Sequence, residues 1–515
     1  MDQDNSGNRH SRREFLKAGA GALGALSVTG NSFGATSGQA SAGARRPNFV
    51  FFLSEGVRPD EFSASKLQGW NGNGLSAMGS GIIKTPNQDR IITEGITFQN
   101  AFVTYALCLP SRASILTGLY PHRSGAIDNR RRSIPEGVPT IADMLRDTGY
   151  DVAFFGKAHV HDLSKRNWDT FFGVEAAGAN YYHPVLVESH QGVVQSKKEY
   201  HGYVDDIIAE RALKWLSERT DKPFCLFFWF IAPHAPFYRP RRLLDLYNGV
   251  RIPKPSTFDA DLKGYPGKPM AFKNADNRIG TTVLDDDDPR SLEELVKDHF
   301  AGVVNNDNNV GKVMDQLEEA GKLDDTAMIL SSDHGFFLGE WRFYDKRFMH
   351  EPSIRVPLSI RYPRLLKNGV TRDEMALNID IPPTILELAG VTEPDWKDWV
   401  QGRSLVPFMK RTPPTDWRKD WLYEYYEYPG EQMVRPQRGV RTERYKLIHY
   451  FLPPQEFELY DLQEDPGELH NLYGDPRYTK LAADLRNRID ELRKETGDQY
   501  EYQTPNAFEY EKQKM

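Results

Sequence analysis

Residues 108–118, with the sequence Cys-Leu-Pro-Ser-Arg-Ala-Ser-Ile-Leu-Thr-Gly, place a thiol four positions before an arginine. A Cys-x-Pro-x-Arg core can arise by chance in 515 residues. The same core followed at this spacing by Leu-Thr-Gly is far less frequent by chance. The chain has one other cysteine, Cys225, so a disulfide-stapled framework and a zinc site built on cysteine pairs are excluded. The thiol of Cys108 has the chemistry of a nucleophile, with Arg112 close by in sequence, and a buried structural thiol is the alternative.

Other side chains that can bind anions, protons or metals follow short apolar runs further along the chain. Taken singly, each lysine reads as surface charge and each histidine as a polar cap. Apolar runs of this kind are typical of buried strands, and the carboxyl ends of parallel strands meet at one edge of a sheet. The candidates are Lys157, His159, His234, Asp333, His334 and Lys346.

The elements that must position these residues form an alternating pattern from residue 47 onward. Short apolar runs with polar flanks predict strands covered on both faces, and the amphipathic stretches between them predict helices. This order indicates an α/β fold with a large, mostly parallel sheet flanked by helices. The expected strands are 49–53, 152–155, 224–231, 328–330 and 357–360, and the expected helices are 140–147, 206–218 and 292–320.

A second region begins near residue 400. Alternating apolar and polar residues between 421 and 461 predict a short antiparallel sheet, and a helix follows with one apolar face. That face comprises Leu481, Leu485, Ile489 and Leu492. We expect a catalytic domain over 45–400 and a smaller C-terminal α+β subdomain over 401–515. The intervening 251–289 segment is expected to be a surface excursion, with its acidic run at 285–288 solvated rather than bound to calcium.

Composition narrows the class of protein. Lysine and arginine total 65 against 72 aspartate and glutamate, a net charge of −7, which argues against general nucleic-acid binding. Hydrophobic residues make up 39% and charged residues 27%, as in a chain with a packed core. Cys225 lies inside an expected strand and is predicted to be a core thiol.

The first 44 residues have the order of an export signal. Arg12 and Arg13 precede a weakly apolar, small-residue-rich stretch that is too short to span a bilayer, and small-x-small sites follow at 40–44. Paired arginines in this position resemble a bacterial twin-arginine signal. We therefore expect a periplasmic or secreted protein that is not held in the membrane after export; a disordered basic tail is the alternative.

The 108–118 segment resembles the modification motif of type I sulfatases, which belong to the alkaline phosphatase superfamily. The resemblance implies that a maturation enzyme oxidises Cys108 to Cα-formylglycine. As a hydrate, this residue has two hydroxyl groups: one attacks sulfur, and the other expels sulfate as the aldehyde re-forms. A serine ester would instead need a water molecule to attack sulfur again.

Four further segments resemble elements of the same family in chain order, namely Gly-Lys-x-His at 156–159, Pro-His-x-Pro at 233–236, Ser-Asp-His-Gly at 332–335 and Tyr-Asp-Lys at 344–346. By this resemblance, the sulfate group is surrounded by Arg112, Lys157 and Lys346. His234 is expected to protonate or hydrogen-bond the leaving alcohol, and His159 is expected to take a proton from the second hydroxyl.

The expected metal site departs from the family pattern. Two adjacent aspartates usually end the first strand, but here Glu55 and Gly56 stand in their places. Calcium prefers about 6–8 oxygen ligands, so the loss of one carboxylate weakens the site unless Asp60 or a water fills the gap. The expected ligands are Asp333, His334, Glu55 and the modified Cys108. Calcium is the expected ion, and the histidine leaves other divalent metals open.

These features predict an exported sulfatase that acts on a sulfated polysaccharide or oligosaccharide. A phosphonate monoester or phosphodiester hydrolase of the same superfamily is the closest alternative. A carbohydrate-binding protein without turnover, with a degraded metal site, is a second. Candidate residues at the rim of the site are Tyr181, Tyr182, His183, Trp341, Arg342 and Tyr344.

Overall fold

The computed structural model describes residues 46–65, 81–130, 133–258, 267–276, 291–391 and 399–502. The expected export signal at 1–44 and the acidic run at 285–288 lie outside the described residues. Residues 46–515 cluster as a single unit, with no division near residue 400. The expected boundary between a catalytic and a C-terminal part thus stays a prediction from the sequence.

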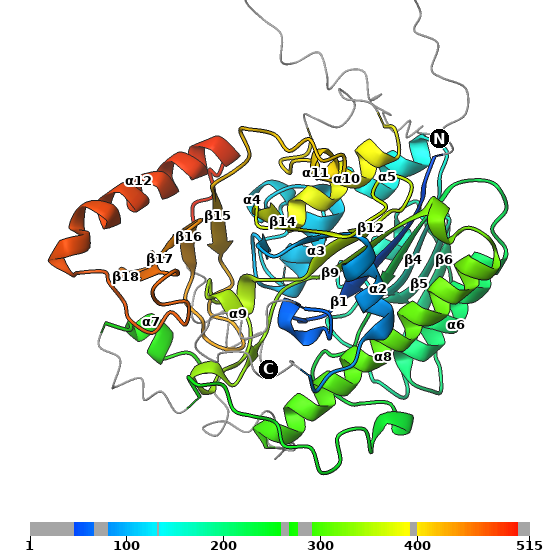
Figure 1. Cartoon of the computed structure of the whole chain (residues 1–515), viewed down its shortest axis with the longest axis horizontal. Helices are drawn as coiled ribbons and strands as arrows, with labels where there is room; N and C mark the ends of the chain where they lie inside the picture. The colour runs from blue at the N-terminus through cyan, green and yellow to red at the C-terminus, as the bar shows by residue number, and fades with distance from the viewer. Residues whose placement is uncertain are drawn as a thin grey trace, which may run out of the picture. The chain divides into compact units, whose positions relative to one another are not determined.

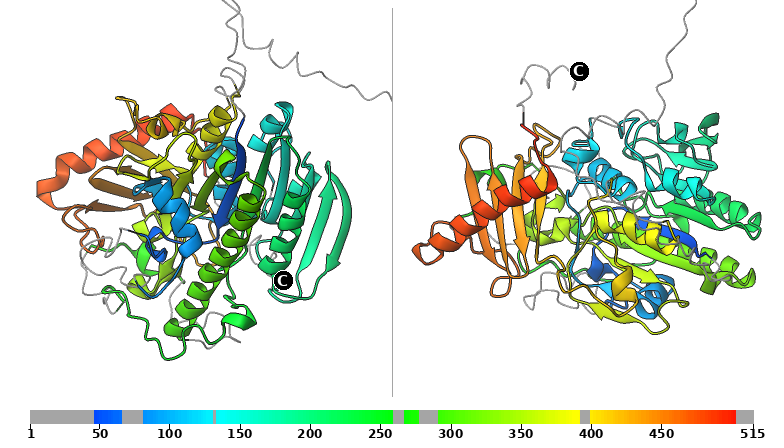
Figure 2. Two further views of the ribbon diagram at one scale, coloured as in Figure 1. Left: turned by 45° about the vertical axis from the view of Figure 1, so that its right-hand side comes forward. Right: turned by 90° about the horizontal axis from the view of Figure 1, so that it is seen from above.

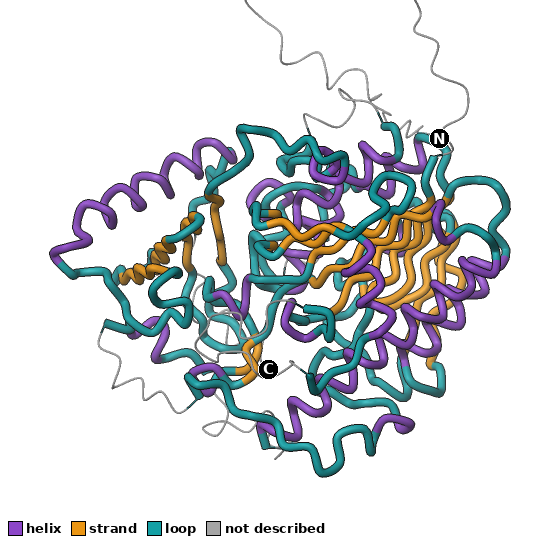
Figure 3. The backbone as a smooth tube through the Cα atoms, in the orientation of Figure 1, coloured by secondary structure: helices purple, strands orange, loops and turns teal. Residues whose placement is uncertain are grey.

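Within the described residues, ten strands form the central sheet in the order β13-β2-β12-β9-β1-β8-β4-β5-β6-β7 (Figures 1 and 3). From β9 to β5 the strands run parallel, whereas β12, β6 and β7 pair with their neighbours in antiparallel fashion. The sheet is therefore mixed, with its parallel strands in the middle. The strand bounds are Asn48–Ser54 (β1), Ile96–Phe98 (β2), Asp151–Lys157 (β4), Thr170–Val174 (β5), Val185–His190 (β6), Val193–Glu199 (β7), Phe224–Trp229 (β8), Thr326–Ser332 (β9), Leu358–Arg361 (β12) and Val370–Arg372 (β13).

Helices cover both faces of this sheet because side chains of the central strands alternate between two apolar cores. Phe52 of β1 and Phe228 of β8 face the core that α2, α6 and α8 close, while Phe51 and Phe227 face the core that α3, α5 and α10 close. Figure 2 shows α6 and α8 along the first face. The helix bounds are Pro86–Glu94 (α2), Cys108–Thr117 (α3), Pro121–Ser124 (α4), Ile141–Asp147 (α5), Val204–Ser217 (α6), Met270–Lys273 (α7), Leu292–Glu319 (α8), Glu351–Ile354 (α9), Ile381–Leu388 (α10), Val406–Met409 (α11) and Thr479–Thr496 (α12).

A smaller antiparallel sheet follows in the C-terminal region, as expected. Its strands are β15 (Asp420–Tyr425), β16 (Gln437–Thr442), β17 (Tyr445–Tyr450) and β18 (Glu456–Asp461), in that order. Helix α12 contacts the first three strands, and it buries the predicted residues Leu485, Ile489 and Leu492, with Leu481 half-buried. Short strand pairs lie elsewhere: β3 (Ala101–Phe102) with β14 (Ala376–Leu377), and β10 (Phe337–Leu338) with β11 (Tyr344–Asp345).

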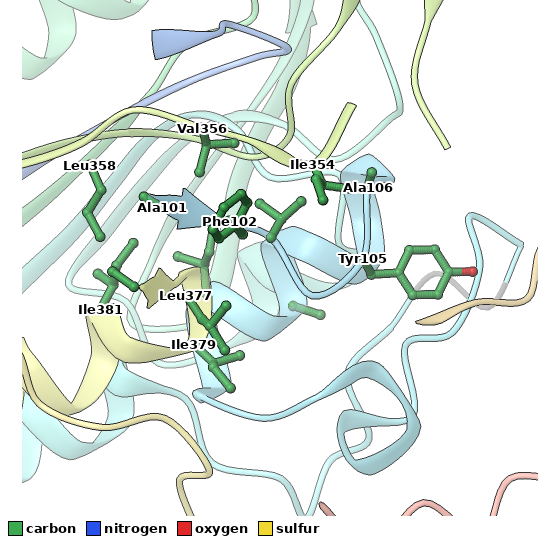
Figure 4. Packing of buried hydrophobic residues seen from close by; sticks show 14 of the residues in the cluster. Ala101, Phe102, Tyr105, Ala106, Ile354, Val356, Leu358, Leu377, Ile379 and Ile381 are labelled. Atoms are coloured by element: carbon green, nitrogen blue, oxygen red, sulfur yellow. The ribbon is translucent and has the colours of Figure 1, made fainter. Parts of the chain in front are cut away.

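The small sheet shares a core with the large one. Phe102 lies among Ala101, Val356 and Leu377 in the cluster of Figure 4, and its ring stacks on Trp421 of β15 with 5.4 Å between ring centroids. Aromatic contacts of this kind add to the free energy of burying the rings themselves. The C-terminal sheet is thus packed against the region that carries α3.

The structure confirms the α/β architecture and each of the predicted strands and helices. One difference is that the expected strand at 357–360 becomes β12, which runs antiparallel to β9. Another is the hairpin of β6 and β7, which the sequence did not reveal because β7 is an exposed edge strand with little apolar alternation. No helix in the described residues is long and apolar enough to cross a membrane.

Candidate active site

The candidate residues gather where four neighbouring parallel strands end. Strands β9, β1, β8 and β4 are adjacent in the sheet, so their carboxyl ends bring together residues that are distant in sequence. The residues at these ends are Glu55 (after β1), Lys157 (last in β4), His234 (beyond β8) and Asp333 with His334 (after β9).

Cys108 is the first residue of α3 and lines a pocket with a volume of about 500 Å³. Its Sγ lies 3.1 Å from Oε1 of Glu55 and 3.4 Å from Nε2 of His334. Burial and the Glu55 carboxylate raise the pKa of this thiol, but nearby cations, Lys346 foremost, hold it well below its usual range. Residue 108 therefore occupies a position that favours a negatively charged group.

Glu55 is the centre of a buried ion-pair network. Its Oε2 accepts hydrogen bonds from Nη2 of Arg112 at 2.7 Å and from Nζ of Lys157 at 2.8 Å. Burial raises the pKa of Glu55, but Lys157 and Arg112 outweigh it and hold the pKa well below its usual range. Glu55, the first of the two residues that depart from the family pattern, thus keeps a full negative charge in the site.

Arg112 and Lys157 lie behind the pocket rather than along its wall. The Arg112 guanidinium also donates to Oδ2 of Asp333 at 2.8 Å and packs over the ring of Trp229. Both cations are fully buried, and neither lines the pocket. In this arrangement they hold the carboxylates of Glu55 and Asp333 in place. The third expected cation, Lys346, does line the pocket, and its Nζ lies 3.0 Å from Oδ1 of Asp345.

Gly56 takes part in the site through its backbone. Its N–H donates to Oδ1 of Asp333 at 3.1 Å, and its φ of 65° lies in the left-handed region that favours glycine. A Cβ at this position would lie 3.1 Å from Phe336 and 3.3 Å from His334. An aspartate, which the family usually has there, would therefore be strained at this φ and would press on both neighbours.

Asp60, one of the two candidates for filling the gap, is bound by Arg58 instead. Arg58 binds both oxygens of the Asp60 carboxylate, at 3.1 and 2.9 Å, and its Nη1 donates to Glu340 at 2.7 Å. This buried network holds Asp60 away from the cluster of metal-binding side chains. Among the described residues, that cluster comprises Glu55, Cys108, Asp333 and His334, with one ligand atom of each lying within 4.8 Å of the others.

The cluster fits a divalent cation. Nδ1 of His334 lies 2.8 Å from the Gly335 carbonyl, which assigns the ring proton to Nδ1 and leaves the Nε2 lone pair facing the cluster. Burial and the Glu55 charge raise the pKa of Asp333 to about 6. Burial opposes protonation of His334, yet Asp333 raises its pKa to about 10. The field of the carboxylates thus favours a positive charge in front of Nε2.

The two remaining histidines near Cys108, His159 and His234, differ in how deeply they are buried. His159 is buried, and burial lowers its pKa to about 4, so the imidazole is neutral and can accept a proton. His234 is partly exposed on the pocket wall, with its Nε2 3.9 Å from Oε1 of Glu55. Its backbone is held by Tyr181, whose hydroxyl donates to the His234 carbonyl at 2.6 Å.

Of the expected rim residues, Tyr344 alone lines the pocket in the described structure. Trp341 is 1% exposed, with Nζ of Lys268 4.9 Å from its ring centre, so it belongs to the core. Tyr181, Tyr182, His183 and Arg342 lie outside the lining. The pocket instead takes up residues that sequence reasoning missed. These are Asn129, Tyr238, Arg347, Glu431 and Gln432, and only Arg347, next to Lys346, adjoins a motif that could have indicated it.

The strand ends of the large mixed sheet carry an acidic cluster that includes a histidine. This cluster faces the start of a helix whose first residue is a cysteine. These are the features of a hydrolase of the alkaline phosphatase superfamily. Comparison with protein families agrees. The sulfatase profile matches residues 47–391, and the profile for the C-terminal part of N-sulphoglucosamine sulphohydrolase matches residues 339–495. The chain belongs to the sulfatase family, and it is a sulfuric ester hydrolase.

Known proteins with similar sequences or structures extend this result. An N-acetylglucosamine-6-O-sulfatase of Bacteroides thetaiotaomicron is 33% identical, with 88% of this chain and 87% of that protein covered. A solved structure in complex with its substrate D-glucosamine-2-N,6-O-disulfate has a TM-score of 0.79 at 31% identity, covering 88% of this chain and 99% of that one. The phosphonate monoester hydrolase of Agrobacterium radiobacter shares the fold, with a TM-score of 0.66 at 22% identity and coverage of 88% and 96%.

Proposed function

We propose that this sulfatase removes the 6-O-sulfate group from glucosamine units of a sulfated polysaccharide or oligosaccharide. The observation that carries the proposal is the similarity, at 33% and 31% identity over 88% of the chain, to an N-acetylglucosamine-6-O-sulfatase and to a protein solved with a glucosamine disulfate. The pocket supports it, because Arg347, Asn129 and Gln432 offer hydrogen-bond donors beside Lys346 for the hydroxyl and amide or sulfamide groups of such a sugar.

In this proposal Cys108 is converted to formylglycine by a maturation enzyme, and its hydrate supplies the hydroxyl that attacks sulfur. The thiol of the structure stands where that hydroxyl would lie. Positive charge from Lys346 and the start of α3 surrounds this position and stabilises an anionic nucleophile. A divalent cation held by Glu55, Asp333, His334 and residue 108 would supply further charge neutralisation. Calcium is the first candidate, and the His334 nitrogen leaves other divalent metals open.

The surrounding side chains divide the remaining tasks. Lys346 faces the pocket and would bind sulfate oxygens, while Arg112 and Lys157 hold Glu55 in place. His234 lies on the pocket wall and would donate a proton to the leaving sugar oxygen. His159, neutral and buried, would accept the proton of the second hydroxyl as sulfate departs.

Export through a twin-arginine signal at residues 1–44 is part of the proposal, and it places the protein in the periplasm or outside the cell. Twin-arginine substrates generally cross the membrane folded, which suits a protein that receives a modified residue and a metal before export. The helices of the described residues give no support for a membrane-spanning segment.

A phosphonate monoester or phosphodiester hydrolase is the second candidate. The fold that this chain shares with a phosphonate monoester hydrolase is the observation behind this candidate.

One experiment separates the two. The protein is co-expressed with a maturation enzyme, the peptide containing Cys108 is weighed by mass spectrometry, and kcat/KM is measured for N-acetylglucosamine-6-sulfate and for an aryl phosphodiester. We expect an aldehyde at residue 108 and a preference for the sulfated sugar of about 100-fold or more. A preference for the phosphodiester would establish the second candidate, and an unconverted thiol would contradict the proposed nucleophile.

A further inference from the structure

A second group of metal-binding side chains lies on the β6–β7 hairpin, apart from the candidate active site. His183 precedes β6, Glu199 is the last residue of β7, and His201 follows two positions later. None of the three lines the pocket at Cys108. Helix α6 begins just beyond them, and the hairpin forms the edge of the large sheet.

The backbone places these side chains on one face of the hairpin. Val185 pairs with Glu199, and the antiparallel register continues past the strand end, because the N–H of Tyr200 donates to the Pro184 carbonyl and the N–H of Gly202 to that of Tyr182. In this register His183 lies directly opposite His201. Glu199 and His201 are two positions apart and therefore share a face.

The three ligand atoms form a triangle of the size that a zinc ion requires. Nδ1 of His183 lies 2.9 Å from Nδ1 of His201, and the same two atoms lie 3.7 and 3.9 Å from Oε1 of Glu199. Tetrahedral zinc with bonds of about 2.0–2.1 Å needs ligand atoms about 3.3 Å apart. The three observed separations bracket this value, so small rotations of these exposed side chains bring the three atoms onto one ion.

The three side chains are exposed to solvent, so water can fill the remaining coordination positions of a bound ion. The side chains of His183, Glu199 and His201 are 56%, 53% and 77% exposed. Two neutral imidazoles and one carboxylate carry a single negative charge, which attracts a divalent cation. The backbone N–H of His183 donates to Oδ1 of Asn180 at 2.9 Å, which fixes the chain at this residue. Imidazole donors favour zinc, copper and nickel over calcium and magnesium.

We propose that His183, Glu199 and His201 form a binding site for a zinc-class divalent cation at the edge of the large sheet. The ion joins the loop before β6 to the end of β7. This loop also carries Tyr181, whose hydroxyl holds the His234 backbone, so the bound ion stabilises a segment that braces the pocket wall. Protons compete for the same nitrogen lone pairs, and binding therefore weakens in acid.

The test uses the full-length protein and Zn²⁺, with bound metal counted by mass spectrometry after equilibrium dialysis. The variants are His201→Asn and Glu199→Gln, and the matched control is His190→Asn. His190 is an exposed histidine of β6 with its Nε2 3.7 Å from Glu188, so it reproduces a single histidine–carboxylate pair on the same hairpin. Zinc held at the Cys108 cluster is common to all four proteins and cancels in the comparison.

We expect wild type and His190→Asn to bind one more zinc ion than His201→Asn, and Glu199→Gln to bind this ion at least about tenfold more weakly than wild type. Equal zinc binding by His201→Asn and wild type would overturn the proposal. An equal loss in His190→Asn would overturn it as well, because binding would then follow histidine content rather than this triangle. The measurement requires no sulfate ester hydrolysis, so its outcome is independent of the proposed function.

Discussion

Nε of Arg112 lies 2.8 Å from Oδ2 of Asp333, while Nη2 of the same guanidinium lies 2.7 Å from Oε2 of Glu55. One buried arginine thus joins two carboxylates that end neighbouring strands and are almost 280 residues apart in sequence. A third contact, from Nη1 to the Lys157 carbonyl, connects Arg112 to β4, which β8 separates from β1 in the sheet. Arg112 therefore fixes the spacing of the side chains in the candidate metal cluster, in addition to contributing charge.

Replacing Arg112 is expected to damage both stability and turnover. Arg112→Ala leaves two buried carboxylates unpaired, which should lower the free energy of unfolding by about 3 kcal/mol or more. Arg112→Lys keeps the charge but cannot reach both carboxylates, so we expect partial recovery of stability and little recovery of kcat. Urea unfolding and sulfate release measure the two effects. Wild-type turnover by Arg112→Lys would contradict the positioning role.

The two cysteines are expected to respond differently to substitution. Cys108→Ala should reduce hydrolysis to the background rate and leave the fold intact, because the side chain is small and lies at the pocket. Cys225→Ala is the matched control: burial raises the pKa of this β8 thiol, and its loss should cost about 1 kcal/mol of stability with turnover kept. Hydrolysis by Cys108→Ala near the wild-type rate would exclude Cys108 as the nucleophile.

Gly56→Ala is expected to weaken cation binding. Its left-handed φ costs a residue with a Cβ about 1–2 kcal/mol, and the added atom would press on His334 and Phe336. Gly249→Ala is a suitable control because its φ is 74° and no atom lies within 4 Å of the added Cβ. Both variants should lose stability in thermal unfolding, whereas only Gly56→Ala should lose cation affinity and turnover. Equal cation affinity in the two variants would show that the contact with His334 is unimportant.

Asp205 gives the protein a pH-dependent contribution to stability. Its carboxylate accepts the N–H groups of Ile231 and Ala232 just before His234, at 2.9 Å each, and burial raises its pKa to about 7. The folded state therefore binds a proton more tightly than the unfolded state, whose aspartate has a pKa of about 4. The resulting stabilisation is complete below pH ~4 and is lost as pH rises toward 7.

Unfolding free energies of wild type and Asp205→Asn measured between pH 4 and 8 test this. The difference between the two should change with pH by up to ~1.4 kcal/mol per unit, with wild type losing stability as pH rises. The variant also loses one of the two acceptors that hold the His234 loop, so its kcat should fall at every pH. A difference that does not vary with pH would mean that Asp205 is ionised throughout.

The fold was predictable from sequence where apolar periodicity was strong. The runs that became β1, β4, β8 and β9 are apolar throughout, and such runs are buried on both faces of a parallel sheet. Strand β7 lacked this signal because an edge strand keeps most of its side chains in water. The antiparallel direction of β12 was also hidden, since periodicity does not encode direction.

The amino-acid sequence alone was enough to identify the family, the candidate nucleophile and the residues expected around it. Residue types at fixed spacing within short segments are local properties, which need no tertiary structure to be recognised. Tertiary structure decided what those residues contact. In the folded protein, Glu55 forms ion pairs with Arg112 and Lys157, and Asp60 forms one with Arg58. Trp341 is buried in the core. The tertiary structure also placed His183 opposite His201. These outcomes depend on strand register and on which charges share a buried space, and both arise only when distant segments pack together.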